Sequence, residues 1–342
     1  MLRELSARHR SWPLAAPFRI SRGVKHSAET VVVEIRQDGC RGRGESVPYA
    51  RYGETVESVL HQIECARLAI AGGVTRTQLA ELLPAGAARN ALDCALWDLQ
   101  AQLAGSSVWS LLQVAPPQVL TTALTVSLDT PERMGEAAAR IASARLVKVK
   151  VDASAPAAQI QAVRRAAPDA RLIVDPNESW DIGLLREMQP VLAALDVALV
   201  EQPLPATDDD ALQGFESVAP ICADESCHVA ADLPRLRGRY QAVNIKLDKT
   251  GGLTEALALR AAAHADGFRI MVGCMICSSL AVAPAFLVAR DAEFVDLDGP
   301  LWLKADHDGG VRSHNGALQP AAAGFWGQAD GTIREDAAAS AR

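Results

Sequence analysis

The sequence predicts an α/β protein: a (β/α)7β TIM-like barrel with an N-terminal α+β capping domain. Two observations support this fold. From residue 121 onward, strand-like segments recur at a step of about 25 residues, the length of one βα unit, and eight of them can be counted. The first ~115 residues lack this period and combine β-branched runs with amphipathic helical patterns.

Composition excludes several protein classes. The 342 residues are enough for one barrel and a smaller domain, and 49% hydrophobic residues can supply a full core. The formal net charge of −7 argues against a nucleic-acid surface. The N-terminus has no apolar core of signal-peptide length, and the longest apolar run near the C-terminus, residues 280–289, is too short to span a bilayer, so we expect no membrane partner and a cytoplasmic location.

The seven cysteines are scattered along the chain and odd in number, which is typical of reduced thiols in the cytoplasm. Cys274 and Cys277 form a single C-x-x-C pair. No second pair follows at zinc-site spacing, so small thiols lining a barrel wall are favoured over a redox or metal role.

The capping domain, residues 1–115, is predicted to begin with a strand pair. Residues 29–36 (ETVVVEIR) are rich in β-branched residues, and residues 37–44 contain the turn signals of a hairpin. Three helical patterns follow, at residues 56–71, 77–83 and 87–104. The last is the strongest, and Gly105 ends it.

The barrel domain is predicted over residues 116–305. Its strands begin near residues 121, 146, 171, 197, 219, 242, 268 and 293. An alanine-rich helix is expected at residues 131–143, after the first strand. A doubly wound open sheet is the rival architecture, but it would not usually place charged residues at the end of every strand. The glycine-rich segment 306–342 is predicted to pack back on the capping domain, with residues 335–342 frayed.

Three carboxylates end three successive strands of this series: Asp175, Glu201 and Asp224. Because the carboxyl ends of barrel strands meet at one face, we expect these groups to converge. Three hard oxygen ligands suit Mg²⁺, and the absence of His or Cys at these strand ends disfavours zinc. A single carboxylate there could merely cap the following helix, but three on neighbouring strands weaken that interpretation.

Two lysines, Lys150 and Lys246, end strands on opposite sides of the predicted ring. Free lysine has a pKa of about 10.4, so a lysine base needs a neighbour that disfavours its charge. Lys148 can do this for Lys150, because alternate residues of a strand share one face. Two opposed bases would remove a proton from one face of a carbon and return one to the other. K-x-K alone would more simply indicate a solvated strand edge.

These residues resemble the enolase superfamily, and specifically its muconate-lactonizing subgroup. The matching segments are VKVK (147–150), DPNESW (175–180), VEQPLP (200–205), CADES (222–226) and VNIKLDKTGGL (243–253). The resemblance implies Asp175, Glu201 and Asp224 as Mg²⁺ ligands. It also implies Lys150 and Lys246 as the acid/base pair, with Lys148 on the substrate carboxylate.

Within that subgroup, the eighth strand resembles the dipeptide epimerases. It ends in FVDLDGP (294–300), in which Asp296 and Asp298 stand two residues apart. Such a pair presents acceptors on one side of a strand for a cation, and the resemblance implies that they hold the α-ammonium of a dipeptide. Muconate cycloisomerases and o-succinylbenzoate synthases act on substrates without that ammonium.

Further segments look like the bacterial epimerases that act on L-Ala-D/L-Glu in murein peptide recycling: 84–99, 221–228 and 244–259. In that family a mobile loop covers the substrate, and residues 18–27 match it. The resemblance implies that Arg22 pairs with the glutamate side chain and that Thr125 and Cys274 contact substrate. The chain departs from many relatives at DPNES, where they have alanine and glycine, and its loop is one residue longer than in some.

The leading hypothesis is therefore a Mg²⁺-dependent dipeptide epimerase, an isomerase that moves the α-proton of the C-terminal residue. Three alternatives stay open: another side-chain specificity, a lyase of the muconate cycloisomerase or o-succinylbenzoate synthase type, and a non-catalytic metal-stabilised barrel. The expected partner is a small dipeptide. The sequence leaves the oligomeric state open, and a homo-oligomer is compatible with it.

Overall fold

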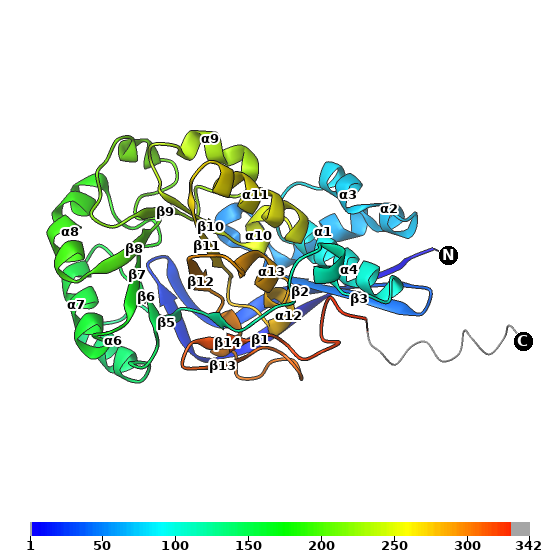
Figure 1. Ribbon diagram of the computed structural model, residues 1–342, viewed down its shortest axis with the longest axis horizontal. Helices are drawn as coiled ribbons and strands as arrows, with labels where there is room; N and C mark the ends of the chain where they lie inside the picture. Colours follow the sequence, from blue (N-terminus) through cyan, green and yellow to red (C-terminus); the bar gives the residue numbers. More distant parts are fainter. Residues whose placement is uncertain (1, 330–342) are drawn as a thin grey trace, which may run out of the picture.

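The computed structural model describes residues 2–329, and an eight-stranded parallel sheet forms its centre (Figure 1). The strands follow one another in chain order around the sheet: β5 (Leu124–Val126), β6 (Leu146–Lys150), β7 (Arg171–Asp175), β8 (Val197–Glu201), β9 (Ile221–Ala223), β10 (Ala242–Ile245), β11 (Arg269–Gly273) and β12 (Phe294–Asp296). The Ala123 amide donates to Val295 O at 2.7 Å, which brings the last strand beside the first. The predicted barrel is confirmed.

Helices cover the outside of this barrel (Figure 1). They are α6 (Pro131–Ala139), α7 (Pro156–Ala166), α8 (Ile182–Ala194), α9 (Leu233–Leu236), α11 (Leu253–Ala265) and α13 (Ala285–Ala289). The short helices α10 (Leu247–Thr250) and α12 (Ser279–Val282) instead contact the N-terminal capping domain. Between β8 and β9 the connection holds only the 3-10 turn η2 (Asp209–Leu212), so this βα unit lacks a regular helix. Two more 3-10 turns, η3 (Ala230–Asp232) and η4 (Gly299–Trp302), shape the loops near the site.

The barrel interior is filled by one inward-facing residue from each strand or its start. This cluster consists of buried side chains: Ala123, Leu146, Ile173, Leu199, Cys222, Ala242, Met271 and Phe294. Packed side chains fill the core of such barrels, so chemistry is confined to the strand ends. Cys222 belongs to this packing, and burial raises the pKa of its thiol well above the ordinary value.

The capping domain begins with a three-stranded antiparallel sheet, β1 (Glu4–Ile20), β2 (Gly23–Gln37) and β3 (Cys40–Ser46). The predicted turn at 37–44 was wrong in extent: only Asp38 and Gly39 turn, and both have positive φ. β1 was not predicted, because its polar sequence has little alternation. Its register with β2 supplies the backbone hydrogen bonds that stabilise it instead.

The helices of this domain are α1 (Val56–Cys65), α2 (Arg67–Ala71), α3 (Arg76–Leu82), α4 (Ala87–Leu103) and α5 (Val108–Leu111), with the 3-10 turn η1 (Ala50–Tyr52) before them. Helices α1, α2 and α4 contact the sheet, and α3 and α5 contact α4. The sheet approaches α4 through glycine. A Cβ at Gly42 would lie 2.1 Å from Ala95 O, and one at Gly44 would lie 2.1 Å from Ala91 O. These two glycines let β3 rest directly on the α4 backbone.

The chain after the barrel returns to both domains. β13 (Arg312–His314) and β14 (Ala317–Gln319) form a small sheet with β4 (Leu120–Thr121). Farther on, Trp326 Nε1 donates to Arg43 O at 2.9 Å, in the capping sheet. We propose domain boundaries near residues 115 and 305. The predicted fraying at 335–342 lies outside the described residues.

Across the domain junction, the Asp248 carboxylate joins barrel and cap. Its Oδ1 accepts from the Val47 amide at 2.9 Å and from Asn90 Nδ2 at 2.7 Å. Burial raises the pKa of Asp248 to about 7. No helix in the described part of the chain is long and apolar enough to cross a membrane.

Candidate active site

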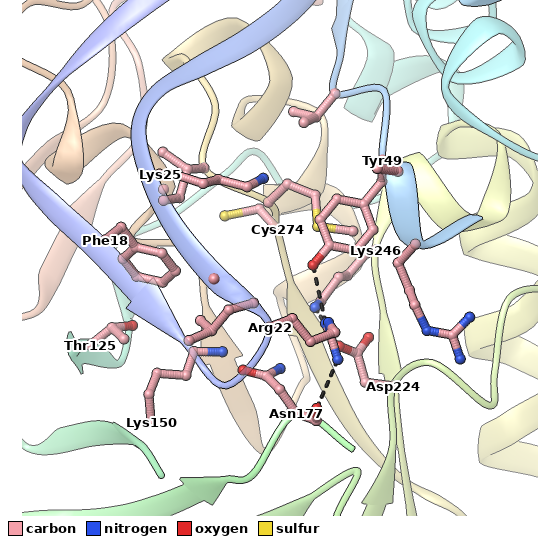
Figure 2. Close-up of a pocket in the computed structure, with 18 of the residues that line it drawn as sticks. Phe18, Arg22, Lys25, Tyr49, Thr125, Lys150, Asn177, Asp224, Lys246 and Cys274 are labelled. Carbon is pink, nitrogen blue, oxygen red and sulfur yellow. Dashed lines mark hydrogen bonds and ion pairs between the residues drawn. The ribbon is translucent and has the colours of Figure 1, made fainter. Parts of the chain in front are cut away.

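A cavity of about 640 Å³ lies at the carboxyl ends of the barrel strands, beneath the capping domain. The tip of the β1–β2 hairpin and residues around Tyr49 cover it, while the strand ends form its floor (Figure 2). The volume is in the range that holds a small organic ligand. The polar side chains predicted from sequence lie in this cavity or directly beneath it.

The three carboxylates stand where the strand ends were expected to place them. Asp175 ends β7, Glu201 ends β8, and Asp224 follows β9, all of them buried. Backbone and side-chain donors orient each one. The Asn177 amide donates to Asp175 Oδ1 at 2.9 Å, and Asn244 Nδ2 donates to Glu201 Oε1 at 2.7 Å.

Lys249 orients the third carboxylate and was not identified from the sequence. Its ammonium is fully buried and donates to Asp224 Oδ1 at 2.6 Å, to Asp224 O at 2.5 Å and to Asn244 O at 2.9 Å. The segment NIKLDK (244–249) contained the signal, because a lysine one turn after a strand-end lysine points back to the same site.

The Lys148 ammonium lies among the carboxylates. Its Nζ is 2.6 Å from Glu201 Oε2, 2.7 Å from Asp296 Oδ2 and 3.1 Å from Asp175 Oδ2. Burial lowers the pKa of Lys148, but Asp296 and Glu201 outweigh burial and raise it well above its usual value. Lys148 is therefore a fixed positive charge in this arrangement.

Lys150 and Lys246 reach into the cavity from β6 and from the end of β10, strands that are four positions apart in the sheet (Figure 2). Lys150 Nζ lies 2.5 Å from Asp175 Oδ2, and Lys246 Nζ lies 2.6 Å from Asp224 Oδ2. Burial lowers the pKa of Lys246, but Asp224 and then Glu201 raise it above the ordinary value. These carboxylates therefore favour the protonated form of Lys246.

Asp175, Glu201 and Asp224 are the candidate ligands for a divalent cation. Within residues 2–329, no three His, Cys, Asp or Glu side chains are gathered closely enough to hold one. Burial and the charge of Asp175 raise the pKa of Glu201 to about 7. Its Oε2 accepts no hydrogen bond, although Lys148 Nζ lies nearby. Three buried, mutually repelling carboxylates fit a divalent cation in charge and donor type, and they would have to move closer together to share one.

Asp296 and Asp298 form a second acidic pair at the end of β12. Asp298 Oδ2 accepts from the Thr125 amide at 2.8 Å, so Thr125 contributes its backbone to this corner. Burial and the charge of Asp296 raise the pKa of Asp298 to about 6. Asp296 Oδ1 is buried without a hydrogen-bond partner among the described residues, which leaves one acceptor open. Cys274 is half-buried in the same cavity wall.

Arg22 lies at the cavity as expected, at the tip of the β1–β2 hairpin. Its Nη2 donates to Glu225 Oε1 at 2.7 Å and to Tyr49 Oη at 3.1 Å. Its Nη1 donates to Asn177 O at 2.8 Å and to Glu178 Oε2 at 3.2 Å. Burial lowers the pKa of Arg22, but Glu225 outweighs this and raises it. These hydrogen bonds connect the hairpin to the barrel.

Glu178 and Glu225 form ion pairs with Arg22, and neither was identified from the sequence as functional. Glu178 also accepts hydrogen bonds from Arg51, from Nε at 2.7 Å and from Nη2 at 2.8 Å. Its φ of 67° is left-handed, which costs free energy for a residue with a side chain. The signal was the departure from alanine and glycine in DPNES, since a carboxylate there can hold two arginines of the cap.

The chain is similar to known proteins over most of its length. The family model for the mandelate racemase / muconate lactonizing enzyme N-terminal domain matches residues 2–113, and that for the enolase C-terminal domain-like family matches residues 133–325. The chain is 48% identical to the L-Ala-D/L-Glu epimerase of Escherichia coli over 93% of its length and 99% of that protein. It is 47% identical to the N-acetyl-D-glutamate racemase of a Pseudoalteromonas species, over 89% of this chain and 97% of that protein.

Solved structures show the same similarity. An enolase family member from Agrobacterium tumefaciens, with homology to dipeptide epimerases, contains bound sodium and L-Ala-L-Glu and has an ordered loop. It superposes with a TM-score of 0.93 at 46% identity, covering 95% of this chain and all of that one. The dipeptide epimerase of Enterococcus faecalis, complexed with Mg and L-Leu-L-Tyr, gives 0.87 at 28% identity over 94% of this chain and 98% of that one.

Proposed function

This chain belongs to the mandelate racemase and muconate lactonizing enzyme family of the enolase superfamily, and we propose that it epimerises L-Ala-D/L-Glu. The observation that carries the proposal is one cavity that holds Lys150 and Lys246, on strands four positions apart, above three buried carboxylates. The stereocentre is the α-carbon of the C-terminal residue.

The two lysines perform the proton transfer. One neutral amine removes the α-proton from one face of the carbon, and the ammonium of the other delivers a proton to the opposite face. The electron pair left on carbon spreads into the adjacent carboxylate until the new proton arrives. Because that proton arrives on the opposite face, the product has the opposite configuration and the same atoms. For the reverse reaction the two lysines exchange roles.

We propose Mg²⁺ as the cofactor, held by Asp175, Glu201 and Asp224. When bound, it supplies positive charge next to the substrate carboxylate as negative charge develops there. Lys148, whose ammonium lies against two of these ligands, adds a second positive charge for the same carboxylate. The buried position of this cluster excludes water and strengthens each of these interactions.

The other end of the dipeptide is assigned to the acidic corner. We propose that Asp296 and Asp298 hold the α-ammonium of the N-terminal residue, with Asp296 Oδ1 as the open acceptor. The Thr125 amide fixes the Asp298 carboxylate in place, and Cys274 adds wall surface. We place the reaction in murein peptide recycling in the cytoplasm, a setting compatible with the seven free cysteines.

A racemase of N-acetylglutamate is the second candidate, because one relative at 47% identity carries that name. N-Acetylglutamate has the same glutamate moiety but no ammonium. The same absence applies to the substrates of the lyase alternatives. Asp296 and Asp298 would then remain buried without a cationic partner from the substrate, which favours the dipeptide.

Exchange in D₂O tests the proposal. With Mg²⁺ and L-Ala-L-Glu, we expect deuterium at the glutamate α-carbon and both diastereomers at equilibrium, measured by mass spectrometry and NMR. N-Acetyl-L-glutamate should react at least 100-fold more slowly in kcat/KM. Asp296→Asn should lower kcat/KM for the dipeptide and leave the slow N-acetylglutamate rate nearly the same. A faster reaction with N-acetyl-L-glutamate would contradict the dipeptide assignment.

A further inference from the structure

Six cationic side chains line the cavity, and five of them face a carboxylate. Within residues 2–329, the shortest ion pair that each of these five makes is Arg22–Glu225 at 2.7 Å, Arg51–Glu178 at 2.7 Å, Lys148–Glu201 at 2.6 Å, Lys150–Asp175 at 2.5 Å and Lys246–Asp224 at 2.6 Å. The sixth cation, Lys25, has no carboxylate within ion-pair distance in this described part of the chain. Of the three cap cations that line the cavity in the described part of the chain, Lys25 is therefore the one left uncompensated for the side-chain carboxylate of a substrate.

Arg22 is poorly suited to bind a further anion. Four acceptors already use both of its terminal nitrogens. One of them, Glu225, is almost completely buried, and its second oxygen accepts no hydrogen bond among the described residues. Releasing Arg22 to a substrate would leave that carboxylate buried without its cation, which is strongly unfavourable.

Lys25 has the opposite properties. It lies on β2 beside the hairpin tip, opposite Phe18 in the register of β1 and β2. Its ammonium is 5.0 Å from the centre of the Tyr49 ring, and Figure 2 shows the side chain extending across the cavity toward Tyr49. A flexible lysine stem with a free ammonium can follow a carboxylate at the end of a two-methylene side chain.

We infer that Lys25 binds the side-chain carboxylate of the C-terminal residue and sets the preference for acidic dipeptides, while Arg22 fastens the hairpin over the cavity. The inference rests on the proposed epimerase function and adds a specificity residue to it. Tyr49 supports both parts: its ring faces the Lys25 ammonium, and its hydroxyl accepts from Arg22.

The experiment compares L-Ala-L-Glu with its neutral isostere L-Ala-L-Gln, using the full chain with Mg²⁺. Lys25→Met should lower the ratio of kcat/KM for L-Ala-L-Glu over L-Ala-L-Gln at least tenfold, mainly through KM. Lys25→Arg should restore most of the ratio. Lys304→Met is the matched control, because Lys304 is exposed and does not line the cavity, and it should not change the ratio. Arg22→Met should slow both substrates by a similar factor.

Charge reversal gives a second, independent readout. Lys25→Glu should raise kcat/KM for L-Ala-L-Lys relative to L-Ala-L-Glu by more than 100-fold. If the wild-type protein turns over both neutral and acidic dipeptides and Lys25→Met leaves their ratio unchanged, the Lys25 assignment is wrong and the epimerase function stands. If the selective loss appears in Arg22→Met instead, Arg22 is the binding residue. If wild-type protein exchanges no L-Ala-L-Xaa dipeptide, the proposed function and this inference both fail.

Discussion

At the scale of single residues, the site is a set of charges whose protonation depends on their neighbours. Asp175 lies against two lysines, and although burial raises its pKa, these lysines lower it below the usual range. Glu201, in the same cluster, has its pKa raised to about 7 by burial and by Asp175. The lysine ammonium groups therefore stabilise the charged form of Asp175 more than that of Glu201. An additional cation would stabilise the charged form of Glu201 more than that of Asp175.

Substitution of the two lysines should separate their roles. Each of Lys150→Ala and Lys246→Ala should lower the epimerisation rate by about 10²–10⁴-fold, the usual contribution of a positioned acid or base. Each variant should still exchange the α-proton with D₂O from one configuration, and the two variants should retain opposite configurations. NMR of L-Ala-L-Glu and L-Ala-D-Glu measures this. Loss of exchange from the same diastereomer in both variants would contradict the two-base mechanism.

At the scale of elements, close backbone contact fixes how β3 sits on α4. A methyl group at Gly42 would meet Ala95 O and the Leu99 backbone, which cannot move without shifting the helix. At Gly135, inside α6, the nearest atom to such a methyl group would be 3.6 Å away, an ordinary contact. The two glycines therefore serve different purposes, although both lie within regular elements.

These positions predict stability changes of opposite sign. Gly42→Ala should lower the free energy of unfolding by about 3 kcal/mol, the upper range of overpacking. Gly135→Ala, the matched control, should raise it by about 0.5–1 kcal/mol because alanine favours the helical state. Urea denaturation measures both. Equal stability of the two variants would show that β3 can move away from α4 at little cost.

The link between barrel and cap through Asp248 predicts a pH effect on stability. Its pKa is raised in the folded state, so the proton it holds stabilises the fold fully below pH 4, and this contribution is lost as pH rises toward 7. From pH 5 to 8, the stability of wild type relative to Asp248→Asn should fall by about 2 to 4 kcal/mol. Parallel urea titrations of both proteins test this, and curves that stay parallel would contradict it.

At the scale of the whole molecule, the chain brings distant segments together at one end of the barrel. The carboxylates come from three strands, the acidic pair from the last strand, and the covering hairpin from the first residues of the chain (Figure 1). Arg22 and Arg51 of the cap meet Glu178 of the barrel. The site therefore exists only when cap and barrel are folded against each other.

Mg²⁺ should stabilise this assembly as a unit. At 100 times its Kd it should add about 2.7 kcal/mol to the free energy of unfolding and raise Tm, and chelation should abolish proton exchange. Glu201→Gln should lose the Mg²⁺ effect. At pH 8 without Mg²⁺ this variant should melt above wild type, because ionising a group with a raised pKa costs stability as pH rises. Calorimetry with and without Mg²⁺ measures both, and a Mg²⁺-dependent Tm in the variant would argue against Glu201 as a ligand.

The sequence by itself determined the barrel and its charged strand ends. A βα period of about 25 residues and an apolar run before each charged residue are local properties, and they placed Asp175, Glu201, Asp224, Lys150 and Lys246 at one face. It did not determine β1 or the extent of the hairpin, because these depend on cross-strand pairing more than on local preference.

Only the tertiary structure decided which charges meet. Sequence signals mark Glu178 and Lys249 as unusual, but they do not identify the partners of Glu178 and Glu225, since ion pairs form between segments brought together by folding. The same applies to Arg22 and Lys25, which are three residues apart at the tip of one hairpin but differ in their surroundings. Charge type can be read from sequence, whereas the compensation of a charge by its neighbours is a property of the folded cavity.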